Sequence, residues 1–129
     1  MQFQGFQLEI DEAALPWRAT RHEGIEWFPL HPRPEAPGAT GPRDSTVLIR
    51  MAPGRGYPRH RHLDVEEVLI LRGGYRDERG EHGAGTYLRY EAGSEHTPVA
   101  LGDRGAPVGP KNEACVLFAI ARGGVRNLE

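Results

Sequence analysis

The sequence is poor in the features that mark secreted, membrane and nucleic-acid-binding proteins. Its single cysteine, Cys115, excludes an internal disulfide and a cysteine-rich zinc cluster, and its apolar neighbours favour a small core residue. No apolar run approaches the ~18 residues of a membrane span, and the first residues lack the cationic start and apolar stretch of a secretory signal. The 16 basic and 18 acidic residues nearly cancel, which argues against nucleic-acid binding, since that function favours a basic face. We therefore expect a cytoplasmic protein that contacts neither membranes nor nucleic acid.

Turn-forming residues are abundant, whereas helical patterns are scarce. The 129 residues, one domain's length, include 17 glycines and 11 prolines, and proline is dense in an expected loop over residues 29–42. The one helix candidate, residues 11–15, is a single turn stopped by Pro16. Short apolar segments recur about every ten residues, which is typical of an all-β sandwich or barrel. The expected strands are residues 24–30, 45–51, 65–72, 75–79, 86–90, 97–101 and 114–121.

A His-x-His pair carries the candidate metal site. Successive side chains on a strand point to opposite faces, so His60 and His62 share one face and converge on a common point. Glu66 and Glu67 are both near enough along the chain to supply a third ligand, but only one of them can face the same side. His96 is the candidate fourth ligand. Imidazole and carboxylate ligands suit zinc, iron, manganese, nickel or copper, so we expect one divalent metal ion without selecting among them.

The spacing of these residues resembles the cupin superfamily. The first cupin motif, Gly-x5-His-x-His-x3-or-4-Glu-x6-Gly, matches at Gly54, His60, His62, Glu66 and Gly73. It selects Glu66 over Glu67, because six residues then separate the glutamate from Gly73. The second motif matches at Gly85, Gly93 and His96, but Glu91 replaces its proline and Ala100 its asparagine. The resemblance implies a jelly-roll β-barrel (a double-stranded β-helix) over residues 1–129 as a single domain, with motif 1 at residues 54–73 and motif 2 at residues 85–100. The metal would lie inside it, bound by His60, His62, Glu66 and His96.

A narrower resemblance links the sequence to the ChrR-type cupin branch. It is carried by Leu15-Pro16-Trp17, residues 66–71, residues 75–80 and Gly85-Thr86-Tyr87. That branch includes zinc-binding cupin-like domains of anti-sigma factors and small metal-dependent dioxygenases that cleave diketones. The resemblance implies a metal-dependent dioxygenase or lyase acting on a small carbonyl or diketone compound. The alternatives are a non-catalytic metal-bound sensor or small-ligand binding module, and a structural barrel with an empty site.

Four further side chains are candidates for the substrate pocket. Tyr57, Trp27 and Tyr87 are aromatic residues that could reach it, and an inward Arg50 would bind an anionic substrate. The charged run at residues 76–79 instead predicts a solvated hairpin tip.

The remaining polar residues suggest no second site. His22, His31 and His82 lie beside proline, glycine or charged residues, so we expect them in loops without a metal role. Residues 68–71 form a strand that is apolar on both faces and must be covered on both, which favours a homodimer. Because protonated imidazole cannot bind a metal, affinity should fall as pH drops through about 6.5, the ordinary histidine pKa.

Overall fold

A computed structural model describes residues 2–3, 10–30, 44–123 and 125–128 of the chain. The loop expected over residues 29–42 therefore lies largely outside the described residues, as does His31.

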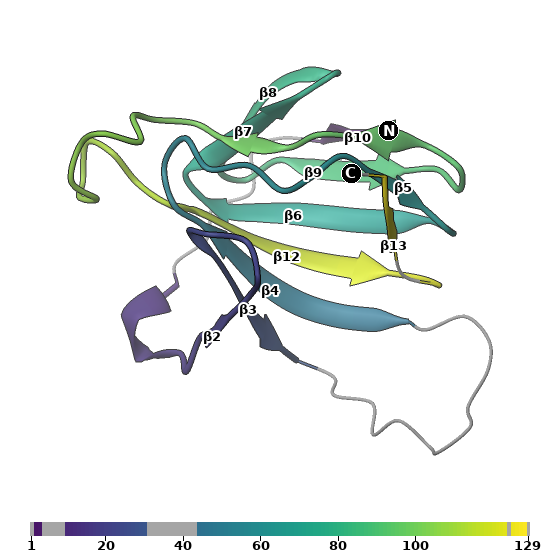
Figure 1. Cartoon of the computed structure of the whole chain (residues 1–129), viewed down its shortest axis with the longest axis horizontal. Helices are drawn as coiled ribbons and strands as arrows, with labels where there is room; N and C mark the ends of the chain where they lie inside the picture. Colours follow the sequence, from purple (N-terminus) through teal and green to yellow (C-terminus); the bar gives the residue numbers. More distant parts are fainter. Residues whose placement is uncertain (1, 4–9, 31–43, 124, 129) are drawn as a thin grey trace.

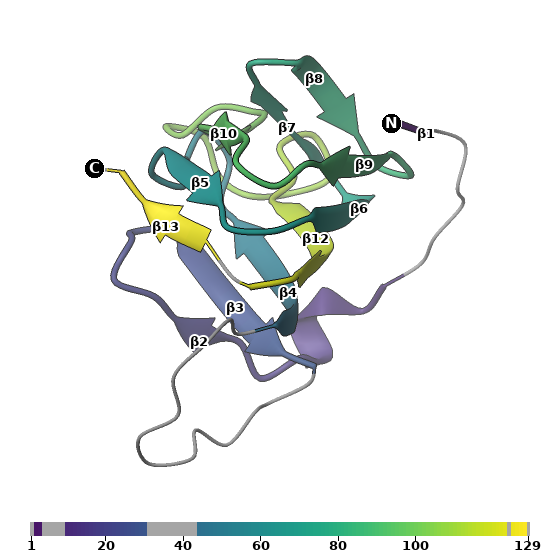
Figure 2. The same ribbon diagram turned by 90° about the vertical axis from the view of Figure 1, so that its right-hand side faces the viewer.

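The described strands form one large antiparallel sheet and two small ones (Figure 1). The large sheet runs in the order β1 (Gln2–Phe3), β9 (Tyr87–Tyr90), β6 (Glu66–Arg72), β12 (Cys115–Ala121), β4 (Ser45–Met51), β3 (Ile25–Pro29) and β2 (Arg18–Ala19). One small sheet is β10 (Glu95–His96), β5 (His60–His62) and β13 (Val125–Asn127), and the other is β11 (Val99–Ala100), β7 (Gly74–Asp77) and β8 (Gly80–Gly83). The chain passes repeatedly from the large sheet to a small one and back, so the sheets face each other as the walls of a jelly-roll barrel (Figure 2).

The all-β prediction is confirmed. The only helix among the described residues is a 3-10 turn at Glu12–Ala14, where a single turn was expected. No described helix has the length and hydrophobicity that crossing a membrane would need. Seven of the described strands coincide with or overlap predicted segments. Of the segment at residues 97–101 only β11 is a strand, and Pro98, which has no N–H to donate, separates it from β10 at Glu95–His96.

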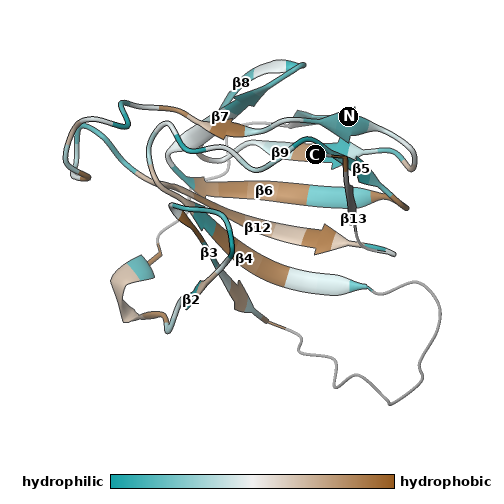
Figure 3. Cartoon of the chain, in the orientation of Figure 1, coloured by the Kyte–Doolittle hydropathy of each residue, from teal (hydrophilic) through white to brown (hydrophobic). Residues whose placement is uncertain are grey.

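Alternation along the central strands builds the core. In β4 the side chains of Val47, Ile49 and Met51 face the barrel interior, and in β6 Val68 and Ile70 do so. These strands and β12 carry the most hydrophobic colouring, while β8 is polar (Figure 3). Leu69 and Leu71, on the opposite face of β6, are only partly buried, and a subunit partner over them stays a prediction.

Cys115 occupies the core, as expected. Its side chain is buried at the start of β12, and burial raises the pKa of the thiol to about 12. A protonated, inaccessible thiol is unreactive, so Cys115 serves packing.

Gly73 permits the tight turn from β6 to β7, and it is the last glycine of the first motif. Its φ of +65° lies in the left-handed region, and an added Cβ would press against the carbonyl oxygen of Ala114. We expect Gly73→Ala to lower the free energy of unfolding by more than about 2 kcal/mol in urea titrations, because both strain and a backbone clash oppose it. Gly83→Ala is the matched control, since a Cβ there meets nothing within 4 Å. Equal stability of the two variants would contradict this role for Gly73.

Candidate metal centre

Three buried histidines meet where β5 pairs with β10. His60 and His62 point into the barrel from β5, and His96 lies opposite His60 in the register of β10. Arg61, between the two β5 histidines, points outward and pairs with exposed Glu95. One nitrogen from each imidazole lies within 4.8 Å of the others. The predicted convergence of these three side chains is therefore present.

Each imidazole is held at Nδ1 by a hydrogen-bond acceptor. His60 donates from Nδ1 to the Pro58 carbonyl oxygen at 2.9 Å. His62 Nδ1 lies 3.0 Å from Ser94 Oγ, whose own proton is donated to the Glu91 carbonyl oxygen at 2.6 Å, so Ser94 accepts from the ring. The same tautomer results in both residues, with the proton on Nδ1 and a lone pair on Nε2.

His96 adopts this tautomer as well. Its Nδ1 donates to Oδ2 of Asp77 at 2.9 Å. The Nε2 atoms of His96 and His60 then face each other at 2.9 Å as two lone pairs, which repel unless a proton or a cation lies between them. His62 Nε2 is buried and has no hydrogen-bond partner within the described part of the chain. All three lone pairs are thus free for a common positive charge.

A proton on His60 does not fill this role near neutral pH. Burial lowers the pKa of His60 to about 4, because desolvation disfavours the imidazolium, and neighbouring His96 lowers it further, against a raising effect of the Pro58 carbonyl. Imidazole nitrogens are good ligands for a divalent metal ion, and His60, His62 and His96 are the residues that would hold it.

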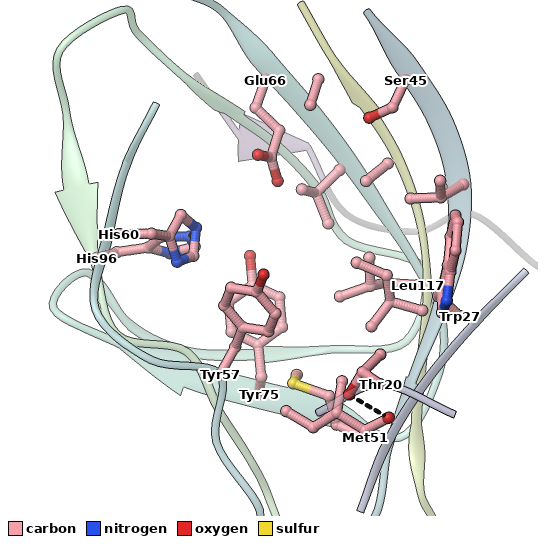
Figure 4. Close-up of a pocket in the computed structure, with 16 residues that line it drawn as sticks. Thr20, Trp27, Ser45, Met51, Tyr57, His60, Glu66, Tyr75, His96 and Leu117 are labelled. Atoms are coloured by element: carbon pink, nitrogen blue, oxygen red, sulfur yellow. Dashed lines mark hydrogen bonds between the residues drawn. The ribbon is translucent and has the colours of Figure 1, made fainter. Parts of the chain in front are cut away.

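Glu66 borders this cluster. Its side chain is turned into the barrel, and its Oε2 lies 3.2 Å from His62 Nε2. Glu67 points to the opposite face of β6, as the first motif implies. In Figure 4 the Glu66 carboxylate stands apart from the His60 and His96 rings, so its place as a fourth ligand stays a prediction.

A cavity of about 310 Å³ opens beside the histidines (Figure 4). Its far wall is apolar and comes from β3, β4 and β12, and its near side carries Tyr57, Tyr75 and Glu66. No lysine or arginine is among the described residues that line it. Tyr57 and Trp27, two of the four predicted pocket residues, are lining residues.

Arg50 and Tyr87, the other two, do not line this cavity. Alternation in β4 turns Arg50 outward, where it donates to Glu26 Oε1 at 2.6 and 3.0 Å and stacks on Trp17. Tyr87 faces outward from β9 for the same reason, since Leu88 and Tyr90 take the inner positions. The expectation that Arg50 would bind an anionic substrate is therefore wrong.

Sequence reasoning missed a buried network behind His96. Asp77 was expected in a solvated hairpin tip, yet its side chain is 0% exposed, and its carboxylate accepts from His96, Tyr90 and His82. Burial alone would raise the pKa of Asp77, but these hydrogen bonds outweigh it and lower the pKa well below its usual range. His82, also expected in a loop, is buried in β8. The alternation Tyr75-x-Asp77 was the available signal, because it puts both residues on the inner face.

Metal binding tests the histidine cluster directly. We expect His60→Ala, His62→Ala and His96→Ala to lower the metal content of the purified protein at least tenfold, because each removes one of three converging lone pairs. Glu66→Gln should lower it less, since an amide oxygen can still coordinate. Elemental analysis by mass spectrometry measures this, with Glu67→Gln on the outer face as the matched control. Unchanged occupancy in all three histidine variants would refute the site.

Burial of neutral His60 predicts the acid sensitivity of the metal-free protein. The unfolded chain binds a proton at His60 below about pH 6.5, whereas the folded chain does not until about pH 4. The free energy of unfolding therefore keeps the full contribution of neutral His60 above pH 6.5. It falls by up to about 3 kcal/mol as the pH drops to 4, at about 1.4 kcal/mol per pH unit. The pH at which protons compete with a metal ion for His60 likewise moves from the expected value of about 6.5 towards 4.

Urea unfolding from pH 8 to pH 4 measures this dependence. The His60→Gln variant, which cannot take up the proton, should show a flatter curve over the same range. A wild-type curve as flat as that of the variant would contradict the burial of a neutral imidazole.

Comparison with known proteins agrees with this fold and these motifs. The ChrR Cupin-like domain family matches residues 7–112, which include both motifs. The anti-sigma-E factor ChrR of Cereibacter sphaeroides is 38% identical over 61 residues, 47% of this chain and 29% of that protein. This chain therefore spans less than a third of that curated relative.

Two solved structures extend the comparison. The complex of Rhodobacter sphaeroides SigE with the anti-sigma ChrR aligns with a TM-score of 0.63 and 27% identity, over 85% of this chain and 50% of that chain. Acetylacetone dioxygenase from Acinetobacter johnsonii aligns with a TM-score of 0.68 over 98% of this chain and 80% of that chain, and at 14% identity it supports the fold alone. Because the family match covers most of the sequence, this chain belongs to the ChrR cupin-like domain family.

Proposed function

We propose that this protein is a metal-dependent dioxygenase or lyase that acts on a small, uncharged carbonyl compound such as a diketone. The observation that carries the proposal is the convergence of three buried imidazoles on one side of an apolar cavity. When bound there, a redox-active metal such as iron(II) would hold the substrate oxygens and react with dioxygen, whereas zinc would support only hydrolytic or isomerising chemistry.

The cavity favours an uncharged substrate. A volume of about 310 Å³ lies at the small end of ligand pockets, which suits a compact molecule. Its described lining offers no cationic side chain to an anion, and its apolar wall excludes water from the reacting atoms. Carboxylates and phosphates are thus poorer candidates than ketones and diketones.

Two groups on the near side of the cavity can handle protons. Glu66 is the only carboxylate among the described lining residues, so it is the base available to accept a proton from the carbon between two carbonyls. The hydroxyl of Tyr57 points towards the same space and would orient a substrate oxygen (Figure 4). Glu67, the alternative third ligand from sequence, faces away from the cavity.

The similarity to ChrR favours a second function, a non-catalytic metal-bound sensor or small-ligand binding module. This chain aligns with ChrR at 38% identity over 61 residues, and the matched ChrR protein is named as an anti-sigma factor. The two functions share the metal site and differ in whether a bound carbonyl compound is turned over.

Oxygen consumption distinguishes the two functions. The protein is first loaded with iron(II) under argon and is then mixed with acetylacetone in oxygenated buffer. We expect it to consume one dioxygen per molecule of acetylacetone cleaved, with both oxygen atoms retained in the two products. An oxygen electrode and isotope-labelled dioxygen measure this, with His96→Ala as the inactive control. Tightly held zinc after purification without added metal, together with no turnover after exchange to iron, manganese or nickel, would favour the sensor and contradict the enzyme.

A further inference from the structure

Asp77 at the end of β7 is the most heavily engaged buried carboxylate near the candidate metal centre. Its Oδ2 accepts from His96 Nδ1 at 2.9 Å and from the Tyr90 hydroxyl at 2.6 Å. Its Oδ1 accepts from His82 Nε2 at 2.8 Å and from the Arg79 backbone N–H at 2.9 Å. Four donors surround two oxygens, so the group is a carboxylate with no position left for a proton of its own.

His96 therefore differs from the other two histidines of the cluster. The acceptors of His60 and His62 are a backbone carbonyl and a hydroxyl, which are both neutral. Only His96 donates to a charged acceptor, and that acceptor is itself held in place from its other side by β8 through His82. A carboxylate behind a ligating imidazole fixes its tautomer and makes it a stronger donor to a metal.

The charge of Asp77 also favours a role at the candidate metal centre. Among the ion pairs of the described residues, none joins Asp77 to a lysine or arginine side chain; the Arg79 guanidinium lies over the Tyr90 ring and donates to a backbone carbonyl. Asp77 and Glu66 place two carboxylates beside the cluster, at His96 and at His62. A divalent cation between the three Nε2 atoms would balance both.

We propose that Asp77 is a positioning residue, which locks His96 with its Nε2 lone pair directed at the metal position and supplies the second of two carboxylate charges that balance a divalent ion. The inference rests on the metal site proposed above. It adds that a residue which touches neither the metal nor the cavity sets the strength of binding.

The tautomer of His96 in the metal-free wild-type protein gives the first test. Long-range ¹H–¹⁵N correlation spectra should show His96 protonated at Nδ1 and bare at Nε2, and Asp77→Asn should disturb this pattern, because an asparagine presents an N–H group to at least one of the four donors. A wild-type His96 protonated at Nε2 would overturn the proposal. This spectrum of the wild type requires no substitution, so it decides the question even where Asp77→Asn does not fold.

Cobalt(II) binding gives the second test. We expect Asp77→Asn to weaken cobalt affinity about 10- to 100-fold and to shift the visible absorption of the bound ion. Glu78→Gln is the matched control: it removes the same charge from the next residue, which is exposed and bonds the Thr97 backbone N–H rather than a histidine. Its affinity and spectrum should equal those of the wild type.

The outcomes separate the two proposals. Folded Asp77→Asn with wild-type affinity and spectrum overturns the role of Asp77 while leaving the metal site intact. A wild-type protein that binds no cobalt overturns the metal site, and the His96 tautomer then reports on Asp77 by itself.

Discussion

The antiparallel pairing of β5 with β10 is the constraint on which the candidate centre depends. It sets His96 opposite His60, and the two-residue repeat of a strand places His62 beside them on the same face. A register shift of one residue would send His96 to the outside, where Glu95 now pairs with Arg61. Candidate ligands that are 36 positions apart in the chain thus meet through one short strand pair.

Burying three imidazoles is costly unless their polar atoms are satisfied. In this fold the Nδ1 atoms of the three histidines are satisfied by a carbonyl, a hydroxyl and a carboxylate, and the Nε2 atoms face the interior. The Nε2 atoms, which lack this satisfaction, therefore converge at one point beside an apolar cavity. Such an arrangement is unfavourable for packing and is expected where a ligand completes it.

Much of this could be read from local sequence patterns, because strand alternation and motif spacing are local properties. His60, His62 and His96 were identified on that basis, and β4 was predicted with its observed bounds. Arg50 shows what local patterns do not determine. It belongs to the same strand as inward-facing Ile49 and Met51, and only the tertiary structure decides which face of that strand meets the opposite sheet. Asp77 was misjudged because a run of charged residues gives no sign that one of them is buried.

The amino-acid sequence by itself determined the family, the all-β class and the three histidines, since residue type and spacing along one strand carry that information. Only the tertiary structure decided which atoms of those histidines are free, that Asp77 stands behind His96, and that the cavity has no cationic lining among its described residues. These properties arise from contacts between strands distant in the chain. Their partners become neighbours only when the sheets close, so no local pattern records them.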